Sequence, residues 1–190
     1  NILEAGIFST QDIIVCNRTQ ERNQKLSDTY GVQATTKSAD LQSVSLIILA
    51  IKPQGFSKLS FVPQEKSVML SLLAGIRLET LKKKWPQSFF IRVMPNIGQF
   101  VGQGMTGVCF DKDFPESQKK EVRRVLEAGA EILEVQSESM IDNVTAISGS
   151  GPAYFLFFAE ALLQAACKLG FSEDEAQLLV RQTFQGRAHV

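Results

Sequence analysis

The sequence predicts an α/β protein: a doubly wound sheet followed by a segment made only of helices. Through the first two-thirds of the 190 residues, short apolar runs alternate with amphipathic stretches, as strands alternate with helices in this class. The apolar runs are mostly continuous, which is typical of parallel strands covered on both faces. From about Ser137 the pattern is helical throughout. We therefore predict a sheet domain over residues 1–136 and a helical domain over residues 137–190.

Four apolar runs have the length of strands: Ile13–Cys16, Leu46–Ile51, Val68–Leu73 and Phe89–Val93. Three helices are predicted between or after them: Glu21–Tyr30, Leu78–Trp85 and Pro115–Ala130. The first follows the possible cap Thr19 and ends at Gly31, and the second runs into Pro86. The third carries apolar residues on one face and charged residues elsewhere, as a helix packed on a sheet does.

The helical segment begins with a strongly apolar stretch, Ala153–Leu169. Its polar residues Glu160, Gln164 and Lys168 fall on one stripe, so that the rest of the circumference is apolar. A membrane-spanning helix needs about 20 apolar residues with few charges, so we interpret the stretch as a buried helix and predict no membrane partner. One small sheet cannot cover such a helix, and a second subunit is the expected cover.

Gly170 is expected to end this helix. Ser172 and Glu175 have the spacing of a capping box and predict the start of a last helix directly after it.

The composition excludes several classes of function. Lys+Arg 20 and Asp+Glu 20 balance to a net charge of +0, so the chain lacks the basic surface on which nucleic-acid binding depends. Cys16, Cys109 and Cys167 stand far apart without a CxxC motif, and the single histidine is His189. We therefore expect no metal site, no histidine base and no disulfide framework, and we place the protein in the reducing cytoplasm.

The two ends of the sequence are incomplete for such a fold. The chain opens on what resembles the tail of a helix, whereas a doubly wound sheet needs a first strand, and residue 1 is Asn rather than Met. The last residues stop in or just after a helix. We expect the sequence to be part of a longer protein whose first strand and loop precede Asn1.

Polar residues follow the first predicted strand. In dinucleotide-binding sheets an Asp or Glu here selects NAD through the ribose 2′-hydroxyl, whereas an Arg accommodates the 2′-phosphate of NADP. Asn17, Arg18 and Thr19 include no carboxylate. Arg18 can bind a phosphate through two donors, and Thr19 begins a helix whose first amides attract anions. A plain helix cap beside a solvated surface charge is the alternative.

Two further strand ends lie where ligands of open α/β sheets bind. The stretch 50–53, Ala-Ile-Lys-Pro, closes the most apolar strand, and Pro53 favours an extended backbone at Lys52. Leu73, Ala74 and Gly75 close the next strand in the same way. For both, a strand that simply stops is the alternative.

Glycines and hydroxyls gather in two later segments. Four glycines between residues 98 and 107 follow Met-Pro-Asn, and they permit either close approach of a ligand to the backbone or a twisted hairpin. Ser148, Gly149, Ser150 and Gly151 precede Pro152 at the start of a helix. Their hydroxyls and amides can form a cradle for a carboxylate, or only an ordinary helix cap.

Taken together and in this order, these segments resemble one known family. The segments are Asn17–Thr19, Ala50–Gln54, Ser71–Gly75, Arg92–Asn96 with the glycines after it, and Ala146–Tyr154. They resemble the pyrroline-5-carboxylate reductase family over essentially the whole chain, and the Ser-Gly-Ser-Gly-Pro segment is the most specific part.

The resemblance implies a Rossmann domain and a helical dimerisation domain, with a homodimer or higher homo-oligomer formed through residues 153–190. It implies NADPH, or else NADH, as the cofactor and a cytoplasmic location. The implied reaction is the last step of proline biosynthesis: hydride transfer to the C=N carbon of 1-pyrroline-5-carboxylate, which gives L-proline. Such a reaction needs no histidine base, because a cyclic imine is basic enough to arrive protonated.

The resemblance also assigns site residues. Those near the adenosine ribose and its phosphate are Asn17, Arg18 and Thr19, with Ser38 as a further cofactor contact. Those along the pyrophosphate and nicotinamide are Ala50, Ile51, Lys52, Pro53, Leu72, Leu73 and Ala74. The substrate-positioning candidates are Asn96, Ser148, Gly149, Ser150 and Gly151. No residue is assigned a direct catalytic role, and no metal is implied.

The chain departs from the family pattern after Met-Pro-Asn, where the family usually has Thr-Pro and this chain has Ile97 and Gly98. The change removes a hydroxyl and a rigid turn close to the site. The family's glycine-rich phosphate loop and its Ser-Pro-Gly-Gly-Thr-Thr segment would precede Asn1 and follow Val190. Two alternatives stay open: another NADP-dependent reductase of similar two-domain build, and a non-catalytic NADP-binding regulatory paralogue.

Overall fold

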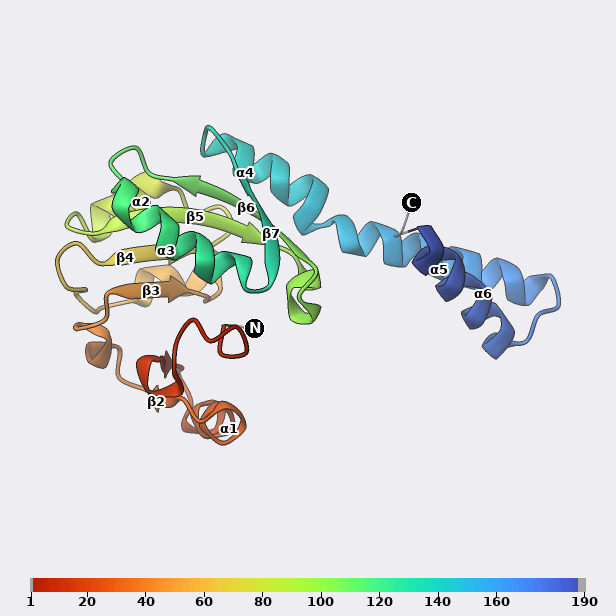
Figure 1. Ribbon diagram of the computed structural model, residues 1–190, viewed down its shortest axis with the longest axis horizontal. Helices are drawn as coiled ribbons and strands as arrows, with labels where there is room; N and C mark the ends of the chain where they lie inside the picture. Colours follow the sequence, from red (N-terminus) through yellow and green to blue (C-terminus); the bar gives the residue numbers. More distant parts are fainter. Residues whose placement is uncertain (1, 188–190) are drawn as a thin grey trace. The chain divides into compact units, whose positions relative to one another are not determined.

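A computed structural model of the protein describes residues 2–187 (Figure 1). The chain divides into two compact units, Asn1–Gly149 and Ser150–Val190. The domain boundary expected between residues 136 and 137 rests on helix content and family resemblance, and it stays a prediction. The single histidine, His189, lies outside the described residues. So do the segments that we expect to precede Asn1 and to follow Val190.

The first unit is built on a five-stranded sheet in the order β3-β4-β5-β6-β7 (Figure 1). Its strands are β3 (Leu46–Leu49), β4 (Val68–Ser71), β5 (Phe89–Pro95), β6 (Gly104–Phe110) and β7 (Ala130–Glu134). All neighbouring strands are parallel except β5 and β6, which are antiparallel. The helices that cover it are α2 (Leu78–Lys84), α3 (Glu116–Glu127) and the 3₁₀ turn η3 (Pro53–Lys58).

The central strands are buried on both faces, which explains their unbroken apolar sequence. Along β4, Met69 packs in one cluster with Leu81 of α2 and Trp85, whereas Val68 and Leu70 pack in a second cluster with α3. The indole of Trp85 donates to the carbonyl of Phe61 at 3.0 Å, so its polar atom is satisfied within the core. The predicted strand and helix positions for this part of the chain are confirmed.

A separate two-stranded parallel sheet precedes the large one. It consists of β1 (Ile14–Cys16) and β2 (Gln33–Thr35), joined by α1 (Gln20–Tyr30). The predicted end of α1 is confirmed, because Gly31 adopts φ 69° and its amide donates to the carbonyl of Ser27. Within the described residues the predicted doubly wound sheet lies in two parts, because β1 pairs with β2, β3 pairs with β4, and no described strand joins them.

The antiparallel strand β6 and the strand β7 were not predicted. β5 and β6 are joined by a short 3₁₀ turn, η4 (Ile97–Val101), and so short a connection suits only antiparallel pairing. The glycine-rich segment therefore forms the hairpin that was one of its two predicted interpretations. β7 alternates buried and exposed positions, so it lacks the continuous apolar run of the central strands.

A short helix, α4 (Ser139–Val144), continues as a π-helix (Thr145–Gly149) and packs on the sheet beside β6. Ile141 and Val144 share an apolar cluster with Cys109 and Val135, and Met94 packs against that cluster. A Cβ at Gly107 would lie 2.7 Å from Cγ1 of Val144, so the glycine lets this helix approach the strand closely.

The second unit is a pair of helices, α5 (Gly151–Lys168) and α6 (Glu173–Arg187). The predicted capping box is confirmed: the amide and hydroxyl of Ser172 both donate to Glu175 at 2.8 Å. Gly170 ends α5 with φ 100°, as predicted. The rings of Phe158 and Phe184 meet edge to face at 6.3 Å between centroids.

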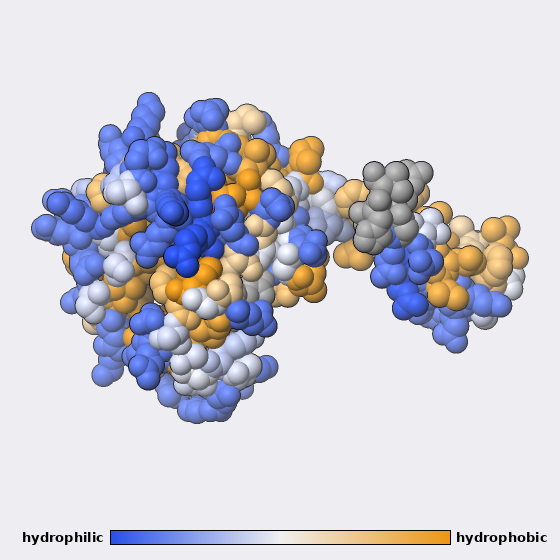
Figure 2. Space-filling model, viewed as in Figure 1, coloured by the Kyte–Doolittle hydropathy of each residue, from blue (hydrophilic) through white to orange (hydrophobic). Residues whose placement is uncertain are grey.

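Within one chain α5 is largely exposed, as the expectation that a second subunit covers it requires. Five consecutive side chains are 58–79% exposed, and these are Tyr154, Phe155, Leu156, Phe157 and Phe158. Figure 2 shows orange, apolar surface on this unit. By length and composition alone, the helical stretch Ser139–Lys168 could cross a membrane. The two polar residues Glu160 and Gln164, joined at 2.9 Å, interrupt its apolar surface, and an exposed apolar surface of this size marks an interaction site.

Candidate cofactor and substrate site

Parallel pairing brings three strand ends to one edge of the large sheet. Leu49 of β3 lies opposite Ser71 of β4, and Ser71 lies opposite Arg92 of β5. The segments that follow β3 and β4 are the predicted cofactor stretches 50–53 and 72–74. β5 continues past this level toward Asn96, so the candidate cofactor and substrate segments share this edge.

The segment after β3 has the predicted backbone. Lys52 is extended, with φ −67° and ψ 140°, and Pro53 begins η3 directly after it. The carbonyl of Lys52 accepts from the amide of Gly55 at 2.8 Å, which closes the turn. Ala50, Ile51 and Lys52 are exposed, and Pro53 is half-buried. These residues form an open rim at the sheet edge that a ligand can reach.

The segment after β4 turns sharply under the same edge. The hydroxyl of Ser71 accepts from the amide of Leu73 at 3.3 Å, and Gly75 adopts φ 75°. The Leu73 side chain is only 2% exposed and belongs to the core, so any contact of this residue with a ligand is made by its backbone. Leu72 is half-buried and Ala74 is exposed.

The predicted ribose and phosphate residues lie at the end of the small sheet. The amide of Asn17 donates to the carbonyl of Thr35, and its side chain donates to Oδ1 of Asn23 at 3.0 Å. Arg18 and Thr19 are exposed. Thr19 occupies the N-cap position of α1, as predicted, and its hydroxyl makes no cap hydrogen bond with the first amides of the helix.

Ser38 begins the 3₁₀ turn η2 (Ser38–Leu41), soon after β2 ends at Thr35. Because β1 and β2 are parallel neighbours, Ser38 and the segment Asn17–Thr19 both follow strand ends at the same edge of the small sheet. The structure therefore groups the ribose-end candidates together. A crevice shared by Arg18 and Lys52 stays a prediction, because the two sheets are not joined by strand pairing.

Asn96 is the most highly connected polar residue of the candidate substrate region. Its Oδ1 accepts from the amides of Gly98 and Met105, at 3.2 and 3.1 Å, which ties together the two ends of the β5–β6 hairpin. Its Nδ2 donates to the hydroxyl of Ser148 at 3.3 Å. The structure thus joins two predicted substrate-positioning residues that lie 52 positions apart.

The other predicted residues of this group flank that bond. A Cβ at Gly149 would stand 3.6 Å from Sδ of Met94, so the π-helix runs close to β5. Ser150 and Gly151 belong to the second unit, at the N-terminus of α5. Ser150 is the N-cap residue of α5, and its hydroxyl makes no cap hydrogen bond with the first amides of that helix.

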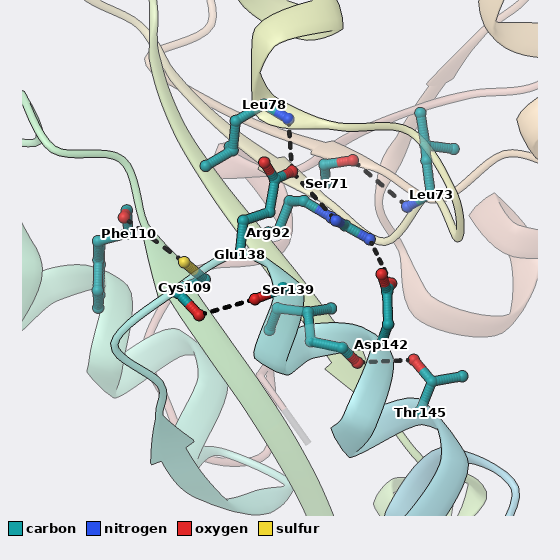
Figure 3. A network of polar contacts seen from close by, with 12 residues as sticks. Ser71, Leu73, Leu78, Arg92, Cys109, Phe110, Glu138, Ser139, Asp142 and Thr145 are labelled. Carbon is teal, nitrogen blue, oxygen red and sulfur yellow. Dashed lines mark hydrogen bonds and ion pairs between the residues drawn. The ribbon is translucent and has the colours of Figure 1, made fainter.

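A buried ion-pair network behind this edge was missed by the sequence analysis (Figure 3). Arg92 of β5 is 3% exposed and contacts Glu138 at 3.0 Å and Asp142 at 3.5 Å. A charged residue inside an otherwise apolar strand was the available signal, since a buried charge requires a partner. The sequence carries no indication of which carboxylates supply it.

The thiols near the strand ends do not suit nucleophilic chemistry. Burial raises the pKa of the Cys109 thiol, and the nearby Glu138 carboxylate raises it further. Burial and the charge of Asp40 likewise raise the pKa of Cys16. Both thiols stay protonated near neutral pH. Within residues 2–187, no group of three or more His, Cys, Asp or Glu side chains is placed to hold a metal ion.

Two parts of the chain match known protein families. Residues 138–190 match the family described as pyrroline-5-carboxylate reductase dimerisation. Residues 1–75 match the family described as NADP oxidoreductase, coenzyme F420-dependent. A pyrroline-5-carboxylate reductase of Corynebacterium melassecola is 34% identical over 98% of this chain and 72% of that protein. The chain belongs to the pyrroline-5-carboxylate reductase family.

Other members of the family have similar sequences and the same fold. A pyrroline-5-carboxylate reductase of Synechocystis is 32% identical over 96% of this chain and 70% of that protein. The solved pyrroline-5-carboxylate reductase of Coxiella burnetii superposes with a TM-score of 0.87 at 29% identity, over 99% of this chain and 73% of that one. The family thus accounts for both the Rossmann-like sheet and the helical C-terminal unit.

Asn96→Ala should destabilise the first unit by about 1–3 kcal/mol, because the amides of Gly98 and Met105 lose their acceptor. Asn96→Asp keeps that acceptor and should cost less. Urea unfolding followed by fluorescence measures both, with the exposed Gln103→Ala in the same segment as the control. Equal stability of Asn96→Ala and the wild type would contradict the structural role.

Proposed function

We propose that the protein reduces 1-pyrroline-5-carboxylate to L-proline, with NADPH as the preferred hydride donor, in the cytoplasm. The observation that carries the proposal is the sheet edge itself. In a member of this family, the cofactor stretches after β3 and β4 lie at the same edge as the bonded pair Asn96 and Ser148. A nicotinamide and an imine can meet there.

The residues present fit a nicotinamide cofactor with a 2′-phosphate. The end of β1 carries Arg18 and no carboxylate, and the hydroxyl of Thr19 does not cap the first amides of α1. A guanidinium and uncapped helix amides suit a phosphate dianion. The Nδ2 of Asn23 nearby is buried without a protein partner, which leaves a donor in the same region.

The chemistry divides between cofactor and protein. The bound cofactor supplies the hydride, and the protein supplies binding, orientation and electrostatics. Ser148 accepts a hydrogen bond from Asn96, so its own hydroxyl proton is left to point toward a substrate group. The exposed rim at Lys52 and the turn after β4 would hold the pyrophosphate and nicotinamide portions of the cofactor.

We also propose that the protein assembles as a homodimer or larger oligomer through α5 and α6. The exposed apolar side chains of α5 lie within the residues that match the dimerisation family. Burying one such side chain is worth about 1.5–3 kcal/mol, so burial of even part of this set by a partner provides ample driving force. A second copy of the chain is the natural cover, because a symmetric contact pairs the same apolar patch with itself.

The full-length protein should consume NADPH when 1-pyrroline-5-carboxylate is added and release one L-proline per NADPH oxidised. Loss of NADPH absorbance together with mass-spectrometric detection of proline measures this. Omission of the imine is the control. Tight NADPH binding without turnover would refute the reductase activity and favour the regulatory paralogue.

Arg18→Ala should raise KM for NADPH about 10- to 100-fold, since one charge-assisted contact with a phosphate is worth about 1.5–3 kcal/mol. KM for NADH should change less than twofold, because NADH has no 2′-phosphate. Steady-state kinetics with each cofactor measure the difference. The exposed Lys25→Ala on α1 is the control. Equal losses for the two cofactors would show that Arg18 does not contact the 2′-phosphate.

The double variant Phe155→Asp/Phe157→Asp should weaken subunit association by more than 100-fold, because two charges replace side chains that the partner is expected to bury. Sedimentation velocity over a range of concentrations should show a monomer. Gln164→Asp, an added charge on the polar stripe, should leave the assembly intact. A double variant that sediments like the wild type would exclude this face as the interface.

A further inference from the structure

Arg92 lies in the middle of β5, between Ser71 of β4 and Cys109 of β6 in the strand register. Alternation along the strand places its side chain on the face of Phe90, which is the face covered by α2. Its guanidinium is almost fully buried and reaches two carboxylates at the start of α4, Glu138 at 3.0 Å and Asp142 at 3.5 Å (Figure 3).

Glu138 has a second contact that links this pair to another element. The same Oε1 accepts from the backbone amide of Leu78 at 2.6 Å, and Leu78 is the first residue of α2. Figure 3 shows the Leu78 amide and the Arg92 guanidinium both pointing at this one carboxylate. A single oxygen therefore connects the start of α2, the strand β5 and the start of α4.

Each connected element leads to a part of the candidate site. The segment 72–77, which contains the predicted nicotinamide contacts, ends at Leu78. The strand β5 leads from Arg92 to Asn96. The helix α4 leads through the π-helix to Ser148. The carboxylate of Glu138 thus contacts Leu78, where the cofactor segment ends, and Arg92, whose strand leads to Asn96. Glu138 itself precedes the helix that leads to Ser148.

The ion pair is not needed merely to hold α4 on the sheet. Ile141 and Val144 already pack against Cys109 and Val135, and Val144 sits close against Gly107. Apolar packing holds α4 on the sheet but permits small translations and rotations of the helix. Directional contacts between charged groups fix the position of the helix along the strand. Hydride transfer is sensitive to such shifts, since a displacement of about 1 Å can reduce a rate about 100-fold.

We propose that Arg92 and Glu138 are positioning residues that set the distance between the cofactor segment 72–77 and the Asn96–Ser148 pair. The inference rests on the proposed reductase function. Neither side chain contacts the reacting atoms. Their effect is on the alignment of cofactor and imine, so it belongs in kcat rather than in the binding of either ligand.

Glu138→Gln is the sharpest test, because the amide keeps an oxygen for Leu78 and loses the charge that holds Arg92. In the full-length protein kcat should fall at least tenfold, while KM for NADPH and for the imine should stay within threefold of wild type. The primary isotope effect on kcat with C4-deuterated NADPH should increase, as hydride transfer becomes slower than product release. Arg92→Lys should retain more activity than Arg92→Met.

A second readout needs neither cofactor nor turnover. In the ligand-free protein, amide hydrogen exchange should become faster in residues 72–78 and in residues 145–149 together, for Glu138→Gln and also for Arg92→Met. Glu79→Gln is the matched control, because it removes an exposed carboxylate of α2 that forms an ion pair with Lys83 on the same helix. It should change neither the exchange nor kcat.

Asp142→Asn provides a milder variant if Glu138→Gln does not fold, since Asp142 is largely exposed and makes the longer contact with Arg92. It should lower kcat about twofold to fivefold and accelerate exchange in both segments. Wild-type kcat and unchanged exchange in Glu138→Gln, or in Asp142→Asn if it alone folds, would overturn the proposal. If wild type itself turns over no imine, the reductase function fails, and coupled exchange of the two segments still decides the structural coupling.

Discussion

The parallel register of β3, β4 and β5 is the constraint on which the candidate site depends. It sets Leu49, Ser71 and Arg92 at one level, so that every segment leaving these strands emerges at the same edge. The segments that follow the three strands differ from one another. An exposed rim follows β3, a tight turn follows β4, and the amide side chain of Asn96 follows β5. Ligand contacts are placed by strand pairing first and by loop sequence second.

The antiparallel return of β6 adds a second constraint. Asn96 closes the β5–β6 hairpin through two backbone amides and donates its side-chain N–H to Ser148. One side chain therefore fixes both the hairpin and the π-helix. The departure at Ile97 and Gly98 falls inside this hairpin, where a Cβ at residue 98 would lie 2.5 Å from the carbonyl oxygen of Gln103. Glycine is what lets the backbone close there.

Sequence patterns predicted the elements whose residues are buried continuously or capped locally. The apolar run of β4 and the Ser172–Glu175 box are examples, because each depends on neighbouring residues alone. The strands β2 and β7 have few buried residues and left no such pattern. The resemblance indicated Asn96 and Ser148, but the Arg92–Glu138 contact spans 46 positions and follows from packing. The sequence pattern also did not indicate that the side chain of Leu73 is buried, so that only its backbone can contact a ligand.

The helical unit has an unusual consequence for folding. Apart from Gly151, the buried residues among its described side chains reduce to Ala176, so a single α5–α6 hairpin has almost no interior of its own. Association through α5, as proposed, would supply this interior by mass action. Folding of the unit would then depend on protein concentration, and dilution would unfold it.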